Sequence, residues 1–265
     1  MRETITAVIP AKNEEKNIEK CIKSVAWCDK ILVMWVGDDK TGEISRNLGA
    51  EVIEKNKGEE NGIVGIQKNI NLAIEKCETD WLLRIDADEL VSDKLKKEIQ
   101  NLLENPSDKE AYGIPRKQYF MGDFLKGGDP VYDRLVRLFK PKAAKYDPIV
   151  PVHEQLTISG KQGLLTGELI HYSHPTLNIL LDKYNSYTSI EATNLEETEF
   201  NAKLKMILLP PYIFLRWMIW HKGYRDGTRG IIAGILRAFY DFLIYSKYLQ
   251  RQLKLKTSPQ SVRIK

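Results

Sequence analysis

The stretch Trp-Leu-Leu-Arg-Ile-Asp-Ala-Asp-Glu, residues 81–89, decides how this chain is interpreted. An apolar run of strand length ends there in three carboxylates, Asp86, Asp88 and Glu89. Carboxylates at the end of a buried strand destabilise a fold unless a cation meets them. In an open α/β sheet, ligands bind at this same end of the strands. The carboxylates therefore indicate either oxygen ligands for Mg²⁺ or Mn²⁺, shared with substrate phosphates, or an Asp cap for a helix that begins near Ser92.

The segments around this stretch alternate between strands and helices. Continuous apolar runs predict strands over residues 5–9, 31–36, 52–53 and 81–85, the first of them stopped by Pro10. Apolar residues at helical spacing predict helices over 18–25, 41–48 and 63–77. This alternation is typical of an α/β fold with a parallel sheet covered on both faces. Neither a G-x-G-x-x-G nor a G-x-x-x-x-G-K-[ST] motif occurs, so dinucleotide binding and P-loop chemistry have no support.

Several segments, in order and spacing, resemble family 2 glycosyltransferases of the GT-A fold. They are Ala-Val-Ile-Pro-Ala-Lys-Asn-Glu-Glu (7–15), Asp39 with Thr41, Gln-Lys-Asn (67–69) and the stretch 81–89. Residues 133–139, 152–154 and 226–230 further resemble the subgroup of lipopolysaccharide core β-1,4-glucosyltransferases. The resemblance covers about residues 4–250. It implies a Rossmann-like nucleotide-diphospho-sugar transferase sheet that becomes mixed after the fourth strand, with a helical C-terminal appendage.

The resemblance also implies a role for each matching residue. The donor nucleoside would be held by Pro10, Ala11, Asn13 and Glu14, with Asp39 and Thr41 near the base and ribose. The donor cleft would be lined by Gln67, Lys68 and Asn69. The sugar diphosphate would be bound at Asp86, Ala87 and Asp88, the two Asp residues holding a divalent metal, Mg²⁺ or Mn²⁺.

One departure from the family concerns the nucleobase. Family members often carry an Asp about seven positions before the Thr, in contact with uracil, and this chain has Met34 there. The departure affects the identity of the base more than the reaction type. A UDP-hexose remains the donor that the resemblance implies, with a saccharide or lipid-linked acceptor.

The reaction requires a base for the acceptor hydroxyl. A carboxylate opposite the leaving group can take this proton, a contribution of ~10²–10⁴-fold. Glu154 is the predicted base, and His153 beside it is predicted to ligate the metal or orient a phosphate. The structural alternatives are an exposed strand charge for Glu154 and a hydrogen-bonded strand residue for His153. Asp133 and Asp129 are rival bases, with turn or strand-end roles as their alternatives.

Length and cysteine usage indicate an ordinary intracellular enzyme. A chain of 265 residues suits a catalytic domain, predicted over 1–175, followed by a helical, basic region over 176–265. The 3 cysteines include no C-x-x-C pair, which predicts reduced thiols in a cytoplasmic protein. Arg2 and Glu3 precede a core strand, so no leader peptide is expected at the N-terminus.

The net charge of +4 conceals an asymmetry. Residues 216–265 hold 11 Lys and Arg against 2 Asp and Glu, giving +9, and residues 1–215 hold 29 against 34, giving −5. Basic residues mixed with Tyr212, Phe214, Trp217 and Trp220 predict peripheral contact with the anionic inner face of the cell membrane. The alternative is a helical subdomain whose aromatic residues pack on the catalytic core. The apolar run over residues 204–220 is interrupted and too short for a membrane-spanning helix. No motif supports nucleic-acid binding.

The sequence therefore predicts an inverting glycosyltransferase that moves a hexose from a nucleotide sugar to a saccharide, such as lipopolysaccharide core. A nucleotidyltransferase is a rival enzyme, but no Gly-rich phosphate loop follows the first strand. A catalytically silent glycan-binding or membrane scaffold protein is a second rival. The intact Asp86, Asp88 and Glu154 argue against it.

Overall fold

The computed structural model describes residues 2–55, 63–147, 156–172 and 176–257. The chain divides into two compact units. The sheet unit comprises Met1–Gln118 and Asp133–Ser173, and the helical unit comprises Tyr119–Tyr132 and His174–Lys265. The helical unit thus combines the C-terminal region with a short segment from the middle of the chain. The division of the domains at residue 175 stays a prediction.

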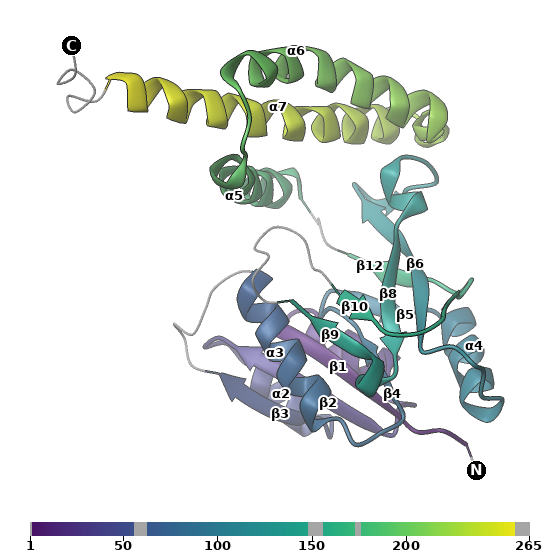
Figure 1. The fold of residues 1–265 in the computed structure, drawn as a ribbon. Helices are drawn as coiled ribbons and strands as arrows, with labels where there is room; N and C mark the ends of the chain where they lie inside the picture. The colour runs from purple at the N-terminus through teal and green to yellow at the C-terminus, as the bar shows by residue number, and fades with distance from the viewer. Residues whose placement is uncertain (1, 56–62, 148–155, 173–175, 258–265) are drawn as a thin grey trace. The chain divides into compact units, whose positions relative to one another are not determined.

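The sheet unit is built on one sheet with the strand order β3-β2-β1-β4-β8-β6-β12-β5 (Figure 1). Its parallel half consists of β3 (Glu51–Lys55), β2 (Lys30–Val36), β1 (Ile5–Lys12) and β4 (Trp81–Arg84). The helices between these strands are α1 (Ile18–Ser24), α2 (Thr41–Asn47) and α3 (Ile63–Lys76). The predicted α/β class is confirmed, and each predicted strand and helix of this half is present.

The other half of the sheet is mixed, as predicted. Strand β8 (Arg134–Phe139) runs antiparallel between β4 and β6 (Ala111–Phe120). Strand β12 (Leu169–His171) is parallel to β6 and antiparallel to β5 (Glu89–Val91). The remaining elements of the unit are α4 (Asp93–Glu104), η2 (Pro141–Ala143), β9 (Ala144–Tyr146), β10 (Leu156–Ile158) and β11 (Gln162–Leu164). Helix α4 is capped by Ser92, whose side chain accepts from Leu95 N, so neither Asp86 nor Asp88 serves as its cap.

Strand β1 extends further than the sequence predicts. It continues through Pro10 to Lys12, paired with β2 along its whole length after Ile5. Pairing with β4 stops earlier, at Val8 opposite Arg84. Proline has no N–H with which to form a hydrogen bond to a second neighbouring strand. It is therefore tolerated in the part of β1 that no longer pairs with β4. The prediction that Pro10 ends the strand is wrong for this reason.

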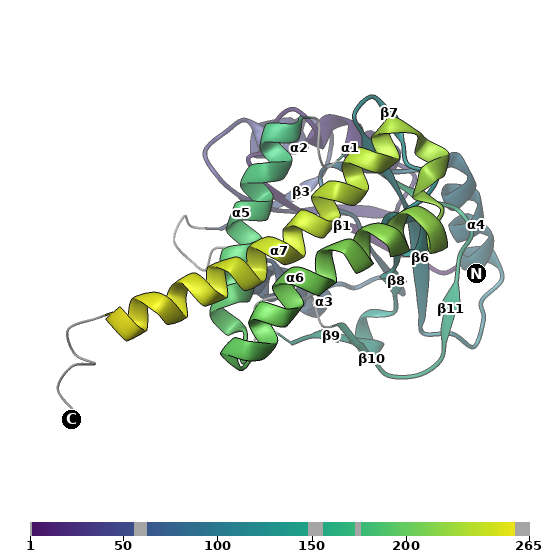
Figure 2. The same ribbon diagram turned by 90° about the horizontal axis from the view of Figure 1, so that it is seen from above.

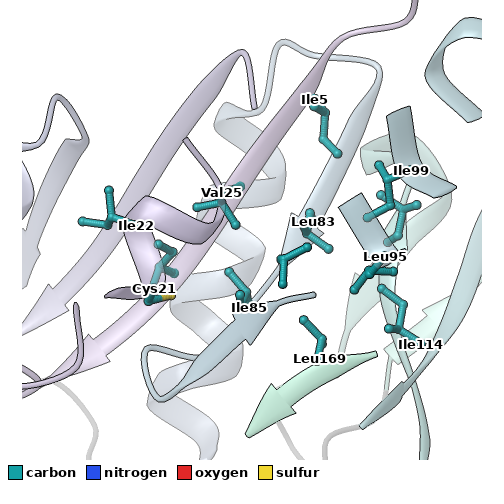
Figure 3. Packing of buried hydrophobic residues seen from close by; sticks show 14 of the residues in the cluster. Ile5, Cys21, Ile22, Val25, Leu83, Ile85, Leu95, Ile99, Ile114 and Leu169 are labelled. Carbon is teal, nitrogen blue, oxygen red and sulfur yellow. The ribbon is translucent and has the colours of Figure 1, made fainter. Parts of the chain in front are cut away.

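Both faces of the sheet are covered by apolar side chains. Alternate residues of a strand point to opposite faces. Ile5, Ala7 and Ile9 accordingly join a cluster with residues of α1 and α4, shown in Figure 3. Val8 joins a second cluster with Ile70 and other residues of α3. Burying each large aliphatic side chain contributes about 1.5–3 kcal/mol of stability. The two clusters therefore stabilise the sheet whose carboxyl end carries the carboxylates.

The helical unit contains two long helices that lie side by side (Figures 1 and 2). Its elements are β7 (Asp123–Phe124), η1 (Asp129–Tyr132), α5 (Leu177–Asn194), α6 (Glu199–Leu215), η3 (Arg216–Trp220), η4 (Gly223–Asp226) and α7 (Thr228–Thr257). Helix α6 begins at a Thr198 cap and contains Pro210 and Pro211. Proline removes a helical hydrogen bond, and the π-helical segment η3 follows within two turns. None of the described helices combines the length and the apolar character needed to cross a membrane.

Trp217 is the centre of a core in the helical unit. It is only 4% exposed and packs with Phe120, Leu125 and other apolar residues of this unit. Its Nε1 donates to Gly230 O at 3.0 Å. A Cβ at Gly128 or Gly223 would lie 2.3–2.4 Å from the indole, so both positions require glycine. The prediction that Trp217 faces a membrane is therefore wrong.

Candidate active site

The loops after β1 and β2 are joined by hydrogen bonds among predicted donor-binding residues. Thr41 Oγ1 accepts from Glu14 N at 2.8 Å and donates to Asp39 Oδ2 at 2.9 Å. Asn13 adopts φ 55°, and its Oδ1 accepts from Asp38 N at 3.3 Å. The structure thus brings Asn13, Glu14, Asp39 and Thr41 together at the carboxyl ends of two parallel strands, where ligands bind in such sheets.

These loops enclose an open cavity of about 330 Å³. Its lining is polar and mostly acidic: Asn13, Glu14, Glu15, Lys16, Asn17, Asp38 and Asp39. Burial acts to raise the pKa of Asp39, but hydrogen bonds from Thr41 and from Glu15 N outweigh burial and hold this pKa below its usual value. An ionised carboxylate accepts hydrogen bonds from hydroxyl groups, which a ribose carries, and from N–H groups, which a nucleobase carries. Pro10 and Ala11 instead lie within β1, and Ala11 packs in the hydrophobic core.

The predicted triplet on α3 does not face one direction. Gln67 is fully buried, and neither atom of its amide has a hydrogen-bond partner among the described residues. Lys68 is exposed and Asn69 is half-buried. Successive residues of a helix point about 100° apart, so three in a row cannot all line one wall of a cleft.

Asp86 lies beyond the carboxyl end of β4 between two buried arginines. Arg137 Nη2 is 2.7 Å from its Oδ2, and Arg84 Nη2 is 3.5 Å from its Oδ1. Burial raises the pKa of Asp86, but the guanidinium groups of Arg137 and Arg84 outweigh it and hold this pKa well below its usual range. Both oxygens of Asp86 are thus engaged by protein cations. Its assignment as a metal ligand stays a prediction.

Asp88 lies opposite a histidine that the sequence analysis did not single out. Its Oδ2 is 3.3 Å from Nε2 of His171. His171 pairs with Glu89 in the β12–β5 register, which places it beside Asp88 across 83 residues of sequence. On its other side, His171 Nδ1 is 2.8 Å from Oε1 of Gln118. A histidine directly after two strand-forming residues was the only signal in the sequence, and it did not distinguish His171 from other strand residues.

Asp88 and His171 fit one divalent cation. The amide oxygen of Gln118 can only accept, so Nδ1 of His171 donates to it and Nε2 is the ring nitrogen that faces Asp88. With a lone pair on Nε2, this nitrogen and the Asp88 carboxylate, 3.3 Å apart, would both face a cation placed between them, whereas a proton on Nε2 would make the contact an ion pair. A metal-bound histidine commonly donates its other N–H in this way. Over the described ranges, no cluster of three or more His, Cys, Asp and Glu has metal-binding geometry. The remaining ligands would come from substrate phosphates and water, as is usual for Mg²⁺.

Glu89 supports the turn that carries both aspartates. It is fully buried, and its Oε2 accepts from Asp86 N at 3.0 Å. Burial and the neighbouring charge of Asp86 raise the pKa of Glu89. Arg116 Nη1 is 3.6 Å from Glu89 Oε1, and its Nη2 is 2.9 Å from Asp133 Oδ2. The charge of Asp133, a predicted base, is therefore engaged by Arg116.

The other predicted bases have different positions. Glu154 and His153 lie outside the described residues. Asp129 lies in the helical unit, where its carboxylate is 2.5 Å from both Arg216 Nη2 and His221 Nδ1. These contacts give Asp129 a structural role in joining η1 to η3.

The N-terminal part of the chain, which includes most of the sheet unit, matches a known family model. Residues 6–153 match the model described as "Glycosyl transferase family 2". The chain belongs to glycosyl transferase family 2. Membership agrees with the GT-A sheet described above, and it sets the nucleotidyltransferase alternative aside.

This family 2 glycosyltransferase resembles curated relatives over nearly its whole length. It is 28% identical to the lipopolysaccharide core biosynthesis glycosyltransferase LpsC of Rhizobium meliloti, over 96% of this chain and 95% of LpsC. It is 30% identical to a glycosyltransferase of Rickettsia typhi, over 96% of this chain and 88% of that protein.

Solved structures of glycosyltransferases are also similar to this chain. Glucosyl-3-phosphoglycerate synthase of Mycobacterium tuberculosis, in complex with Mn²⁺, UDP and phosphoglyceric acid, is 16% identical. That match covers 73% of this chain and 78% of the synthase, with a TM-score of 0.47. The mannosyltransferase PcManGT of Pyrobaculum calidifontis, in complex with GDP-Man and Mn²⁺, is 12% identical. That match covers 98% of this chain and 78% of the mannosyltransferase, with a TM-score of 0.45.

Proposed function

We propose that this glycosyltransferase moves a hexose from a nucleotide sugar to a lipid-linked saccharide, with inversion at the anomeric carbon. The observation that carries the proposal is the pair Asp88 and His171, oriented by Gln118 at the carboxyl end of the sheet. A whole-length relation to a lipopolysaccharide core biosynthesis glycosyltransferase supports lipopolysaccharide core as the acceptor class. A UDP-hexose is the proposed donor.

The acidic cavity beside Asn13 and Asp39 is the proposed nucleoside site. Its carboxylates would accept hydrogen bonds from ribose hydroxyls, and this contact orients the donor before reaction. Asp88 and His171 would hold a Mg²⁺ or Mn²⁺ ion near the diphosphate. When bound, the metal stabilises negative charge on the leaving phosphates as a Lewis acid. Arg137 and Arg84 would fix Asp86, and with it the turn that carries Asp88.

The acceptor hydroxyl requires a proton acceptor, and Glu154 is the proposed base. Inversion requires attack from the face opposite the leaving diphosphate, so this carboxylate would lie across the cleft from Asp88. Glu154→Gln should keep donor binding and lose turnover by ~10²-fold or more. Asp133→Asn is the matched control, and we expect it to lose less, because Arg116 already engages its charge. The reverse ranking of the two variants would transfer the role to Asp133.

Release of the nucleotide from a panel of nucleotide sugars tests the reaction class. We expect release of UDP from a UDP-hexose with Mn²⁺ or Mg²⁺, and none in EDTA. The same assay with a saccharide acceptor separates transfer from hydrolysis. Absence of turnover with every donor and metal would contradict the proposal and favour the glycan-binding scaffold.

We also propose a cytoplasmic location, peripheral at the inner face of the cell membrane. The support is the charge division, −5 over residues 1–215 and +9 over residues 216–265. Each basic residue near an anionic surface adds about 1 kcal/mol of attraction. This location would bring the enzyme to a lipid-linked acceptor.

A further inference from the structure

Large apolar side chains are exposed along one face of α6. They are Phe200, Leu204, Ile207, Leu208, Tyr212 and Leu215, and they are 46–73% exposed. Residues three or four apart lie on the same face of a helix, so these six form one continuous row, here called the α6 stripe. A different face of α6 carries Ala202 and Met206, which pack with Tyr248 and Leu249 of α7. The stripe is therefore a second apolar face, additional to the one that holds α6 in the helical unit.

The α6 stripe continues beyond the helix. Ile219 and Trp220 of η3 are 60% and 64% exposed, and Tyr224 of η4 is 61% exposed. At 1.5 Å per residue, the path from Phe200 to Trp220 is roughly 30 Å long. An exposed apolar surface of this extent marks an interaction site. Trp and Tyr at its end are the residues that favour the level of lipid headgroups.

The same end of the unit presents positive charge. Lys222 and Arg225 are exposed beside Trp220 and Tyr224 in the sequence. The 2 acidic residues of residues 216–265, Asp226 and Asp241, are both engaged by the protein. The Asp226 carboxylate accepts from the N–H groups of Lys126 and Gly127 at 2.9 Å, and Asp241 accepts from Arg237. The field at this end is thus set by the cations.

We infer that the α6 stripe and the turn η3–η4 lie in the headgroup region of an anionic lipid bilayer, with the axis of α6 in the plane of the membrane. An apolar helix face flanked by cations is the pattern of interfacial helices. Two copies of this chain joined through the η3–η4 end would instead bring the exposed Lys222 and Arg225 of both copies together, which disfavours a dimer on the same face. The inference rests on the peripheral location proposed above and names the surface that makes the contact; it does not depend on which sugar the enzyme transfers.

Flotation of the full chain with lipid vesicles tests the inference. The double variant Ile207→Glu with Leu208→Glu removes two members of the stripe, and Glu preserves helix propensity. Leu164→Glu is the matched control, because Leu164 is also an exposed leucine, 69% exposed, on β11 of the sheet unit. We expect binding to phosphatidylcholine–phosphatidylglycerol vesicles to fall about tenfold or more for the double variant, and to be unchanged for Leu164→Glu. Circular dichroism and donor hydrolysis should match the unsubstituted protein for both.

Two further arms distinguish a bilayer from other occupants. Vesicles of phosphatidylcholine alone should bind the chain more weakly, and high salt should weaken binding to anionic vesicles only in part. Trp220 is the most exposed of the 5 tryptophans, so brominated lipid should quench its fluorescence and Trp220→Phe should remove most of this quenching. Equal vesicle binding by the double variant and the unsubstituted protein would overturn the inference. A dimer that dissociates in the double variant, without vesicle binding, would overturn it as well.

Discussion

Among the described residues, two clusters contain an aspartate and a histidine, and they differ in the groups that contact the histidine. In the sheet unit, His171 Nδ1 donates a hydrogen bond to Gln118 Oε1, and its Nε2 lies 3.3 Å from Asp88 Oδ2. In the helical unit, His221 Nδ1 contacts Asp129 directly at 2.5 Å. Arg216 Nη2 and Arg237 Nε lie 2.5 Å and 3.5 Å from the same carboxylate.

The partner of the histidine decides what each cluster can do. Gln118 is neutral and accepts from Nδ1, so Nε2 of His171 is left facing the Asp88 carboxylate. Arginines surround Asp129, so its charge is already compensated by the protein. The first arrangement is suited to a metal ion, and the second to holding the chain together. Residue type alone does not separate a catalytic cluster from a structural one.

The largest expected effect is on nucleotide release, and it distinguishes Asp88 from Asp129. Asp88→Asn should reduce nucleotide release with Mn²⁺ on the order of 10³-fold, because it removes a charged metal ligand from the leaving-group side. The melting temperature should stay nearly unchanged or rise, since a like-charge repulsion is relieved. Full activity of this variant, or of the unsubstituted protein in EDTA, would refute the metal assignment.

Asp129→Asn is the matched variant in the other cluster. It should lower the free energy of unfolding by about 1–3 kcal/mol, because Arg216 and His221 lose a charged acceptor. Nucleotide release per folded molecule should stay within a few-fold of normal. Urea denaturation and the release assay measure the two quantities. A large loss of turnover with normal stability would make Asp129 the base.

The next largest effect is on metal affinity, and it tests whether Gln118 orients His171. Gln118→Met removes the acceptor of His171 Nδ1, and metal-binding histidines without this support lose affinity by about 10–100-fold. The Mn²⁺ concentration for half-maximal activity should rise accordingly. His221→Gln is the control and should leave this concentration unchanged. Equal shifts in both variants would show that the comparison between the clusters is false.

A smaller effect concerns pH and Asp86. Its pKa is lowered in the folded protein, so the stability that its ion pairs add is present above the unfolded value of 3.8 and is lost as the pH falls through the lower folded value. Asp86→Asn should therefore lower the melting temperature at neutral pH. The difference from the unsubstituted protein should shrink below about pH 4. Thermal melts in EDTA across this range measure it, and a constant difference would contradict the role of Arg84 and Arg137.

The strands, the helices and the polar strand ends could be predicted from the sequence, because each depends on the pattern of neighbouring residues. The apolar strands followed by polar turns placed Asp86 and Asp88 at a strand end, and the structure has the four strands and three helices in the predicted order. His171 and Arg137 could not be found in this way. Arg137 meets Asp86 only because β8 pairs with β4, and His171 meets Asp88 only because β12 pairs with β5. Such pairings between distant segments are a property of the whole sheet.

The same limit applies to the aromatic residues of the C-terminal region. Trp217 and Trp220 are three positions apart in an apolar run, and periodicity alone does not show which face α7 will cover. The structure buries Trp217 and exposes Trp220. Gly128, Gly223 and Gly230 mark the buried position, since each allows a close approach to or a hydrogen bond with the indole.

The origin of the helical unit in two separate segments has a consequence for synthesis on the ribosome. Phe120 and Leu125 belong to the core around Trp217, which follows them by 97 and 92 residues. At about 5–20 residues per second, these apolar side chains wait on the order of 5–19 s for their partner. A shortened chain that ends near Lys203 never supplies Trp217. Such a chain should emerge with Phe120 and Leu125 exposed and be prone to aggregate, whereas point variants of α6 keep this core complete.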